Sequence, residues 1–471
     1  IPVVLFFYIH GLFLGAPTVF IPQLRREANS TDVISISMES WLCKFFFSSK
    51  QNNITSAILF SSLPWSFILP VIAHKFGRKK TAIILSLVVT ISTIMLYCSV
   101  TPLQILLSQI VFGILPAAHV VTSIMILTEY FSPKYRGIFM TVKSATSYWG
   151  IWTSNAVGTF FHWKNIAIIS FVCCIINLSI IFWPESPYWL ATKGRFEECS
   201  TAHRWLKGTG EDAEKELFNL IQSQKVYIKR QTTPDQNNIS KYCKLLNTML
   251  KSKKFYMPIW YCLLATALFH LSGKMACSLY AISIIRRITS SDSMAYNGML
   301  ILDGFTVFGM YLGSLSTKFF KRRTLLITAS SIGAAFMFII SLYLYLIEYS
   351  VIEESHYLSI FLLTVYSLSV SCGPLIMCMC ITGELTPLQN RSTFLGILCF
   401  FFNILMGLVI KVAPYMFQSF GLRGAFLFYG ICSFILIYLL YIYLPETKDK
   451  TIIEIEGYFE DITEAKEEKE L

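Results

Sequence analysis

Apolar residues along this chain gather in long blocks that are separated by shorter polar segments. A helix that crosses a bilayer needs roughly 20 mostly apolar residues, and most of the blocks reach that length. Several blocks contain Gly or Pro, which membrane helices tolerate when neighbouring helices satisfy the freed backbone groups. The pattern therefore predicts an all-α membrane protein with twelve transmembrane helices, at about 1–22, 54–73, 81–99, 104–128, 138–160, 164–183, 256–282, 295–316, 324–347, 357–382, 393–417 and 425–444.

Three polar phrases from the first half of the chain recur in the same order in the second half. A basic turn follows the second block of each half, a Glu and an Arg seven positions apart follow the fourth, and a Pro-Glu pair follows the sixth. The paired phrases are HKFGRKK (74–80) with TKFFKRR (317–323), TEYFSPKYRG (128–137) with GELTPLQNRS (383–392), and WPESP (183–187) with LPETK (444–448). This repeat predicts two pseudo-symmetric six-helix halves, as in transporters whose halves rock about a solute site at the membrane midplane.

The repeat also divides the chain into four parts. We expect a first six-helix bundle at 1–183, a cytosolic linker with short helices at 184–255, a second six-helix bundle at 256–444 and an acidic cytosolic tail at 445–471.

Positive charge is concentrated in alternate connections between the blocks, whereas the connection at 348–356 is acidic. This alternation is the positive-inside pattern, and it predicts a multi-pass protein of the cell membrane with both termini in the cytosol. The net charge of +11 gives no separable basic domain, so we expect no nucleic-acid partner. The basic residues in question are Lys75, Arg78, Lys79 and Lys80, Lys134 and Arg136, those of 184–255, and Lys318, Lys321, Arg322 and Arg323.

The recurring phrases carry carboxylates that could meet the cations of the basic turns. Ion pairs between them at the cytosolic face would close a gate in one state and break in another, whereas the simpler alternative is that the cations only set topology. The predicted gating network consists of Arg78, Glu129, Arg136, Glu185, Lys321, Glu384, Arg391 and Glu446.

At these phrases the sequence resembles the sugar porters of the major facilitator superfamily, most closely the insect facilitated trehalose transporters. The resemblance extends over nearly the whole chain, from GLFLGAPTVFIPQL (11–24) through FGRKK (76–80), SPKYRG (132–137) and PESPYWLATKGRFEEC (184–199) to LPETKDKTIIEIE (444–456). It implies the twelve-helix carrier fold, transport of a small solute, contact with membrane lipid, no cofactor, and function as a monomer.

The chain departs from this family at the solute site. A gapless match places Ser144 where the family has a Gln on its fifth helix, and FHLSGKM (269–275) keeps only Ser272 and Gly273 of the amide-rich stretch on the seventh. The chain also departs from the family in the connecting segments. His74 and Thr317 stand where the family has Asp in the two basic turns, and Tyr188 stands where its PESPR phrase has Arg. The tenth helix lacks the Trp that members of the family have there. The candidate solute-binding residues are Ser144, His270, Ser272, Asn403 and Asp303.

Ionisable residues within the apolar blocks are costly and usually functional. Lys143 and Lys411 lie near block ends, from which we expect their side chains to reach the interface. For Asp303 two interpretations stay open: it pairs with Lys274, or it caps a broken helix beside Gly304. The first helix carries no carboxylate of the type that proton-coupled sugar porters have there, so the resemblance implies facilitated diffusion, while His10 and Asp303 leave ion coupling open as an alternative. Trp149, Trp152 and Tyr280 are aromatic residues that could line the pathway.

Several functions are compatible with these features. A sugar facilitator is the leading hypothesis, an organic-ion or other small-solute carrier is the alternative, and a non-transporting solute sensor is a third. We expect no enzyme activity and no metal site, because no nucleophile–base pair or metal-ligand spacing is present. Two sequons in the first outside loop predict N-glycosylation at Asn29 and Asn53, whereas Asn238 should stay unmodified in the cytosolic linker.

Overall fold

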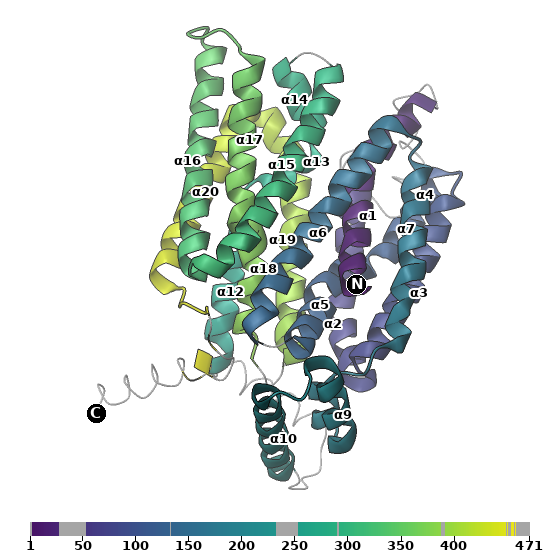
Figure 1. Cartoon of the computed structure of the whole chain (residues 1–471). Coiled ribbons are helices and arrows are strands. Elements are labelled where there is room, and N and C mark those ends of the chain that lie inside the picture. Colours follow the sequence, from purple (N-terminus) through teal and green to yellow (C-terminus); the bar gives the residue numbers. More distant parts are fainter. Residues whose placement is uncertain are drawn as a thin grey trace, which may run out of the picture.

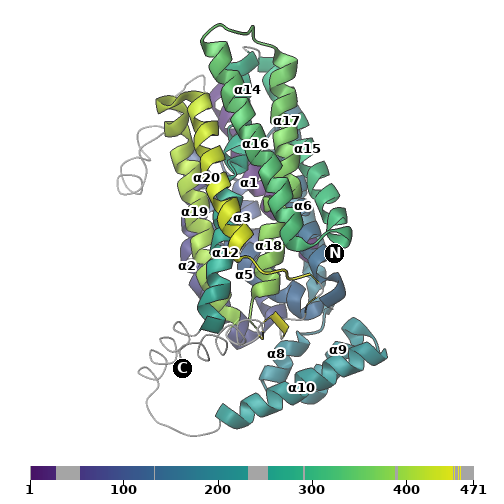
Figure 2. The same cartoon turned by 90° about the vertical axis from the view of Figure 1, so that its left-hand side faces the viewer.

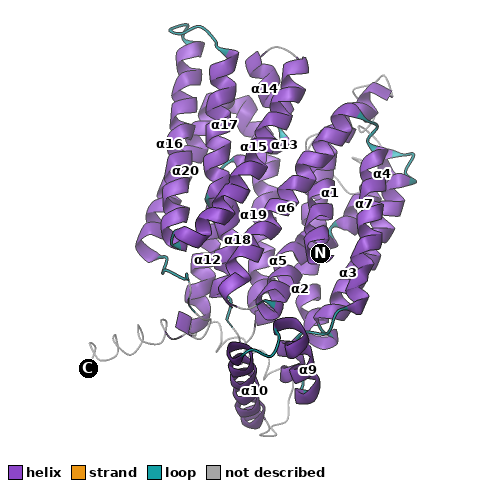
Figure 3. Cartoon of the chain, in the orientation of Figure 1, coloured by secondary structure: helices purple, strands orange, loops and turns teal. Residues whose placement is uncertain are grey.

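The computed structural model describes residues 2–27, 53–131, 133–231, 253–289, 292–387, 391–448, 450, 454–455 and 457. Within these ranges the regular structure is helical, and no strand is drawn in Figure 3. Asn29 and Asn238 lie outside the described residues, and Asn53 begins a helix while its side chain is not described.

The first half of the chain forms one bundle of six membrane-crossing segments. Four of them are single helices, and two are broken: the fourth at Gly113 and the sixth where the α-helix tightens into a 3₁₀ turn. The elements are α1 (Pro2–Glu27), α2 (Asn53–Phe76), α3 (Arg78–Tyr97), α4 (Pro102–Phe112), α5 (Ile114–Tyr130), α6 (Pro133–Phe160), α7 (Lys164–Asn177) and η2 (Leu178–Phe182).

The second half forms a matching bundle that lies beside the first in Figure 1. Its first segment is broken at Gly273, which adopts a φ of 72° that favours glycine, and its fourth is broken at Gly373–Pro374. The elements are α12 (Lys253–Leu271), α13 (Lys274–Leu279), α14 (Ala281–Thr289), α15 (Asp292–Phe319), α16 (Arg322–Glu348), α17 (His356–Cys372), α18 (Pro374–Leu385), α19 (Arg391–Ser419) and α20 (Gly421–Tyr443).

The predicted architecture of twelve membrane helices in two halves is confirmed. Eleven segments in the described ranges are long and apolar enough to cross a membrane. The twelfth is α6, a 28-residue helix that is richer in Ser, Thr and Lys because it packs between α1 and α15 at the centre of the molecule. Large apolar side chains such as Ile91, Ile175 and Phe434 are exposed on the outside of the bundles, where lipid would cover them.

Three helices that connect the bundles in sequence lie below the membrane helices, as Figure 2 shows: α8 (Pro187–Thr192), α9 (Phe196–Lys207) and α10 (Glu211–Gln231). They share a small apolar core of their own that includes Trp189, Cys199 and Leu217. We call the membrane face on this side the basic face, because the turns around Arg78 and Arg322 also lie there. We call the other membrane face the opposite face.

Candidate functional site: a central cavity and the contacts that close it

A small cavity lies between the two halves. The helices of both bundles contribute to its walls, so it occupies the place that the internal repeat predicts for a solute site. The wall from the first half comprises His10, Leu14, Pro116, His119, Ser144, Ser147, Tyr148 and Ile151. The wall from the second half comprises Phe269, Met275, Leu375, Met379, Phe402, Asn403 and Met406.

Close packing of α1 against α6 builds the polar part of the first wall. A Cβ at Gly11 would overlap the backbone carbonyl of Ser147, so only glycine allows the two helices to approach this far. This approach places Nδ1 of His10 3.0 Å from Oγ of Ser147. The His10 ring also stacks on that of His119 from α5, with 4.7 Å between the ring centroids.

Lys143 lies behind this wall. The prediction that its side chain reaches the membrane interface is wrong. Its side chain is only 1% exposed, and its Nζ donates to the His119 carbonyl and to Oγ of Ser123, each at 2.7 Å. The third side of the ammonium group faces the ring of Phe7 at 4.8 Å. Since Lys143 lies well inside α6, the bundle core is closer to its ammonium than the membrane surface is. Lys411, by contrast, is half-buried.

The second wall is mostly apolar. Met275, Met379 and Met406 supply flexible thioether side chains, and Phe402 supplies an aromatic face. Its one amide belongs to Asn403, whose Nδ2 donates to the Cys399 carbonyl at 3.0 Å. The Oδ1 atom of Asn403 is buried and has no hydrogen-bond partner among the described residues.

The structure divides the predicted solute-binding residues into two groups. Ser144 and Asn403 line the cavity, on opposite walls. His270 and Ser272 do not line it. The His270 ring packs against Phe402 instead, and Ser272 donates to its own helix at the Phe269 carbonyl because the chain breaks at Gly273 directly afterwards.

Asp303 also lies away from the cavity, at the contact between the halves. It does not cap a broken helix, because α15 runs without interruption through Asp303 and Gly304. Its carboxylate accepts hydrogen bonds from Nδ2 of Asn155 in the first half, at 2.8 Å, and from Oγ of Ser278 at 3.2 Å. Lys274 is fully buried nearby, but its Nζ makes no hydrogen bond to any described residue.

The contact between α6 and α15 near the opposite face contains a second cross-half bond. Nε1 of Trp152 donates to the Leu300 carbonyl at 3.2 Å. The other two aromatic candidates lie elsewhere. Tyr280 donates to the Ile410 carbonyl within the second half, and Trp149 is 44% exposed. None of these three aromatic residues lines the central cavity.

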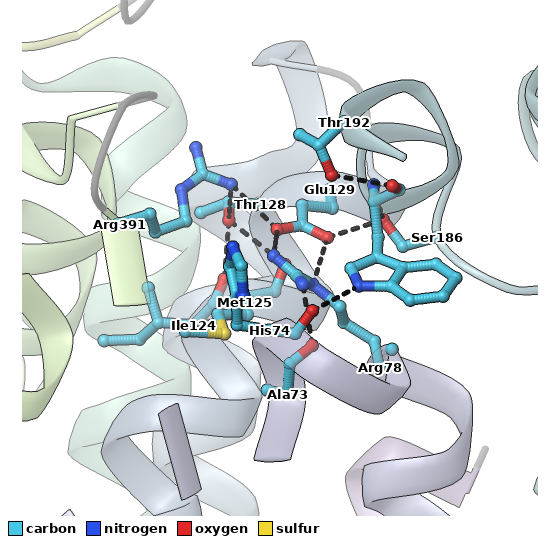
Figure 4. Close-up of polar contacts among 12 residues, drawn as sticks. Ala73, His74, Arg78, Ile124, Met125, Thr128, Glu129, Ser186, Thr192 and Arg391 are labelled. Atoms are coloured by element: carbon cyan, nitrogen blue, oxygen red, sulfur yellow. Dashed lines mark hydrogen bonds and ion pairs between the residues drawn. The ribbon is translucent and has the colours of Figure 1, made fainter. Parts of the chain in front are cut away.

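The basic face carries a buried charge cluster in the first half, shown in Figure 4. Arg78 binds Glu129 through Nε and Nη2, at 2.8 and 2.7 Å, and Ser186 donates to the same carboxylate at 2.5 Å. For Glu185 the predicted ion pair with a basic side chain is replaced by bonds to the backbone. It accepts from the backbone N–H groups of Arg78 and Lys79 at the start of α3, where the helix dipole favours an anion.

The second half repeats this cluster with one change of residue. Arg322, not the predicted Lys321, approaches Glu384, with Nε 3.3 Å from Oε1. The reason is the helix start: Lys321 caps α16 and is exposed, whereas Arg322 is its first residue and points inward. Glu446 accepts from the backbone N–H groups of Arg322 and Arg323, as Glu185 does in the first half.

Arg391 joins the two halves at the basic face. It enters from the start of α19, and Figure 4 shows it beside Glu129 and Thr128 of the first half. Its Nη1 lies 3.0 Å from Oγ1 of Thr128 and 3.4 Å from Oε1 of Glu129. The guanidinium also lies 5.3 Å from the ring centroid of Tyr188. The side chain of Arg136, its counterpart in the repeat, is outside the described part of the structure.

Comparisons with known proteins agree with this geometry. The family model described as "Sugar (and other) transporter" matches residues 6–459. The facilitated trehalose transporter Tret1 of Drosophila willistoni is 26% identical over 81% of this chain and 42% of its own length. Trehalose transporter 1 of Drosophila melanogaster is 25% identical over 81% of this chain and 43% of its own length. The chain therefore spans less than half the length of these relatives.

Solved structures show the same fold. The proton:xylose symporter XylE bound to 6-bromo-6-deoxy-D-glucose, a protein of the major facilitator superfamily, matches with a TM-score of 0.78 at 16% identity, covering 97% of this chain and 98% of that one. The human organic anion transporter MFSD10 matches with a TM-score of 0.57 at 13% identity, covering 93% and 97%.

Proposed function

This chain belongs to the sugar (and other) transporter family, and on that premise we propose that it carries a sugar of the hexose or trehalose kind across the cell membrane by alternating access. The observation that carries the proposal is a cavity walled by both halves and closed at the basic face by the contact of Arg391 with Glu129. The names of the trehalose transporters among its relatives favour the same class of solute.

In this mechanism the bundles at 1–183 and 256–444 rock against each other. The linker at 184–255 and the tail at 445–471 meet the basic face where each begins, through Glu185, Ser186 and Glu446. The positive-inside pattern makes that face, and both termini, cytosolic. We infer facilitated diffusion, since no Asp or Glu lines the cavity among the described residues. We also infer that a monomer suffices, since both walls of the cavity belong to one chain.

A second candidate function is transport of an organic anion. It is favoured by the ammonium group of Lys143, which lies directly behind the first wall beside the imidazoles of His10 and His119. The position of Asp303 argues against a cation as solute, because its carboxylate meets Asn155 at the contact between the halves and does not line the cavity.

Uptake by the full chain in proteoliposomes tests both functions. We expect saturable uptake of radiolabelled glucose or trehalose that is accelerated when the same sugar is present on the other side. Protein-free liposomes measure passive entry. Uptake of a monocarboxylate without uptake of either sugar would replace the first function by the second, and uptake of neither class by folded protein would overturn both.

A further inference from the structure

The two walls of the central cavity differ in chemistry. The first carries two imidazoles and three hydroxyl groups, from His10, His119, Ser144, Ser147 and Tyr148. The second is made of methionine, phenylalanine and leucine side chains, with Asn403 as its one polar residue. Since buried hydroxyl groups of a ligand need hydrogen-bond partners, a solute in this cavity finds such partners mainly on one side.

Two buried polar atoms at the cavity have no partner among the described residues: Nδ1 of His119 and Oδ1 of Asn403. An amide oxygen only accepts hydrogen bonds, so Oδ1 of Asn403 requires a donor such as a hydroxyl group. A carboxylate alone could not supply it. The Asn403 side chain is fixed in its orientation by Nδ2, which donates to Cys399.

We propose that the preferred solute among sugars is a glycoside, in which one sugar ring carries an apolar aglycone. The sugar hydroxyls meet the first wall and Oδ1 of Asn403, and the aglycone lies on the second wall against Met379, Phe402 and Met406. This inference rests on the proposed sugar transport and specifies the solute class of the same cavity.

A free hexose or a disaccharide fits these walls less well. Both carry hydroxyl groups around the whole molecule, and those that face the methionines and phenylalanines would lose their bonds to water without replacement. An apolar aglycone gains from the same surface, because thioether and aromatic groups adapt to flat apolar ligands. A purely apolar solute, in turn, would leave Nδ1 of His119 and Oδ1 of Asn403 without a hydrogen-bond partner.

The test is a series of solutes with one sugar ring and increasing aglycone size, applied to the wild-type chain in proteoliposomes. We expect phenyl β-D-glucoside to be taken up with a KM about tenfold or more below those of methyl β-D-glucoside and glucose. Protein-free liposomes again measure passive entry of each compound.

A variant pair tests the wall itself. Met406→Gln places an amide on the apolar wall at nearly unchanged volume. Met416→Gln makes the same change on α19 at a buried methionine that does not line the cavity. We expect Met406→Gln to reduce the preference for the phenyl glucoside about tenfold, and Met416→Gln to leave it unchanged.

The outcomes separate the two proposals. Uptake of glucose with equal KM for all three compounds overturns the glycoside inference and leaves sugar transport in place. Absence of uptake for every sugar and glycoside, by wild-type protein that elutes as a single folded species, overturns both. A preference that Met416→Gln removes as fully as Met406→Gln also overturns the inference, and the wild-type series decides it if either variant fails to fold.

Discussion

Arg391 of the second half and Glu129 of the first half make a direct charged contact, with 3.4 Å between Nη1 and Oε1. The same carboxylate holds Arg78 of its own half through two shorter bonds. When the halves separate at this face, Arg391 leaves but Arg78 stays. Glu129 is thus spared the cost of a buried, unpaired charge, which would otherwise oppose opening. The contact between Arg391 and Glu129 can therefore break without leaving the Glu129 carboxylate unpaired.

Removing the cross-half cation should favour opening at the basic face. In Arg391→Gln the bonds to Glu129 and Thr128 are lost, and each bond to a charged group contributes about 1.5–3 kcal/mol. We expect faster hydrogen–deuterium exchange at the ends of α5 and α19 by at least about tenfold. The matched control is Arg204→Gln, which breaks the exposed pair with Glu214 in the linker. Equal exchange in both variants would contradict the role of Arg391.

Glu129→Gln should be more damaging than Arg391→Gln. It leaves Arg78 buried without a carboxylate partner, and loss of one member of a buried ion pair costs about 3–5 kcal/mol of stability. The melting temperature in detergent, followed by intrinsic tryptophan fluorescence, measures the difference. Similar melting temperatures for the two variants would show that the Arg78–Glu129 pair contributes little.

Gly77→Ala should destabilise the turn that positions Arg78. Gly77 has a φ of 93°, and a Cβ there would overlap the Glu185 carboxylate. Strain of this kind costs about 1–3 kcal/mol. Gly210→Ala is the control, because Gly210 has no positive φ and nothing lies within 4 Å of the Cβ position. The prediction fails if both variants melt at the wild-type temperature.

Asn155→Leu should loosen the opposite face and leave the basic face unchanged. It removes the cross-half donor to Asp303 while Ser278 continues to donate to that carboxylate. We expect increased hydrogen–deuterium exchange in the halves of α6 and α15 near the opposite face, with unchanged exchange around Arg391. A change confined to the basic face would mean that Asn155 acts in some other way.

Lys143→Met separates the two candidate functions. The substitution removes the cost of burying an ammonium group that has no carboxylate partner among the described residues, and Ser123 still donates to the His119 carbonyl, so we expect an unchanged or higher melting temperature. A sugar carrier should keep its KM for sugar within about twofold, whereas an anion carrier should lose affinity for its solute by about tenfold or more. Lys143→Arg, which keeps the charge, is the companion variant.

The internal repeat predicted much of this structure. It placed Arg78, Glu129, Glu384 and Arg391 at one face, because recurring phrases must occupy equivalent positions in equivalent bundles. It could not decide between Lys321 and Arg322, since that choice depends on the residue at which α16 begins, and helix boundaries are the least certain part of a sequence-based prediction.

The solute site was less predictable for two physical reasons. Apolar blocks that are hydrophobic all round carry little periodicity, so the inward face of α12 and α15 could not be read from them. Breaks in the helices then turn side chains away from the cavity, as Gly273 does after His270 and Ser272. The burial of Lys143 could not be predicted because its hydrogen-bond partners, His119 and Ser123, lie on α5, and the packing of α6 on α5 is a tertiary effect.

The closures at the two faces differ in chemistry. One is held by opposite charges, between Arg391 and Glu129, and the other by neutral donors, Asn155 to a carboxylate and Trp152 to a carbonyl. An empty carrier built this way spends more of its time open on the side with the weaker closure. Because apparent affinity scales with the fraction of molecules that are ready to bind, solute arriving from that side is captured at lower concentration.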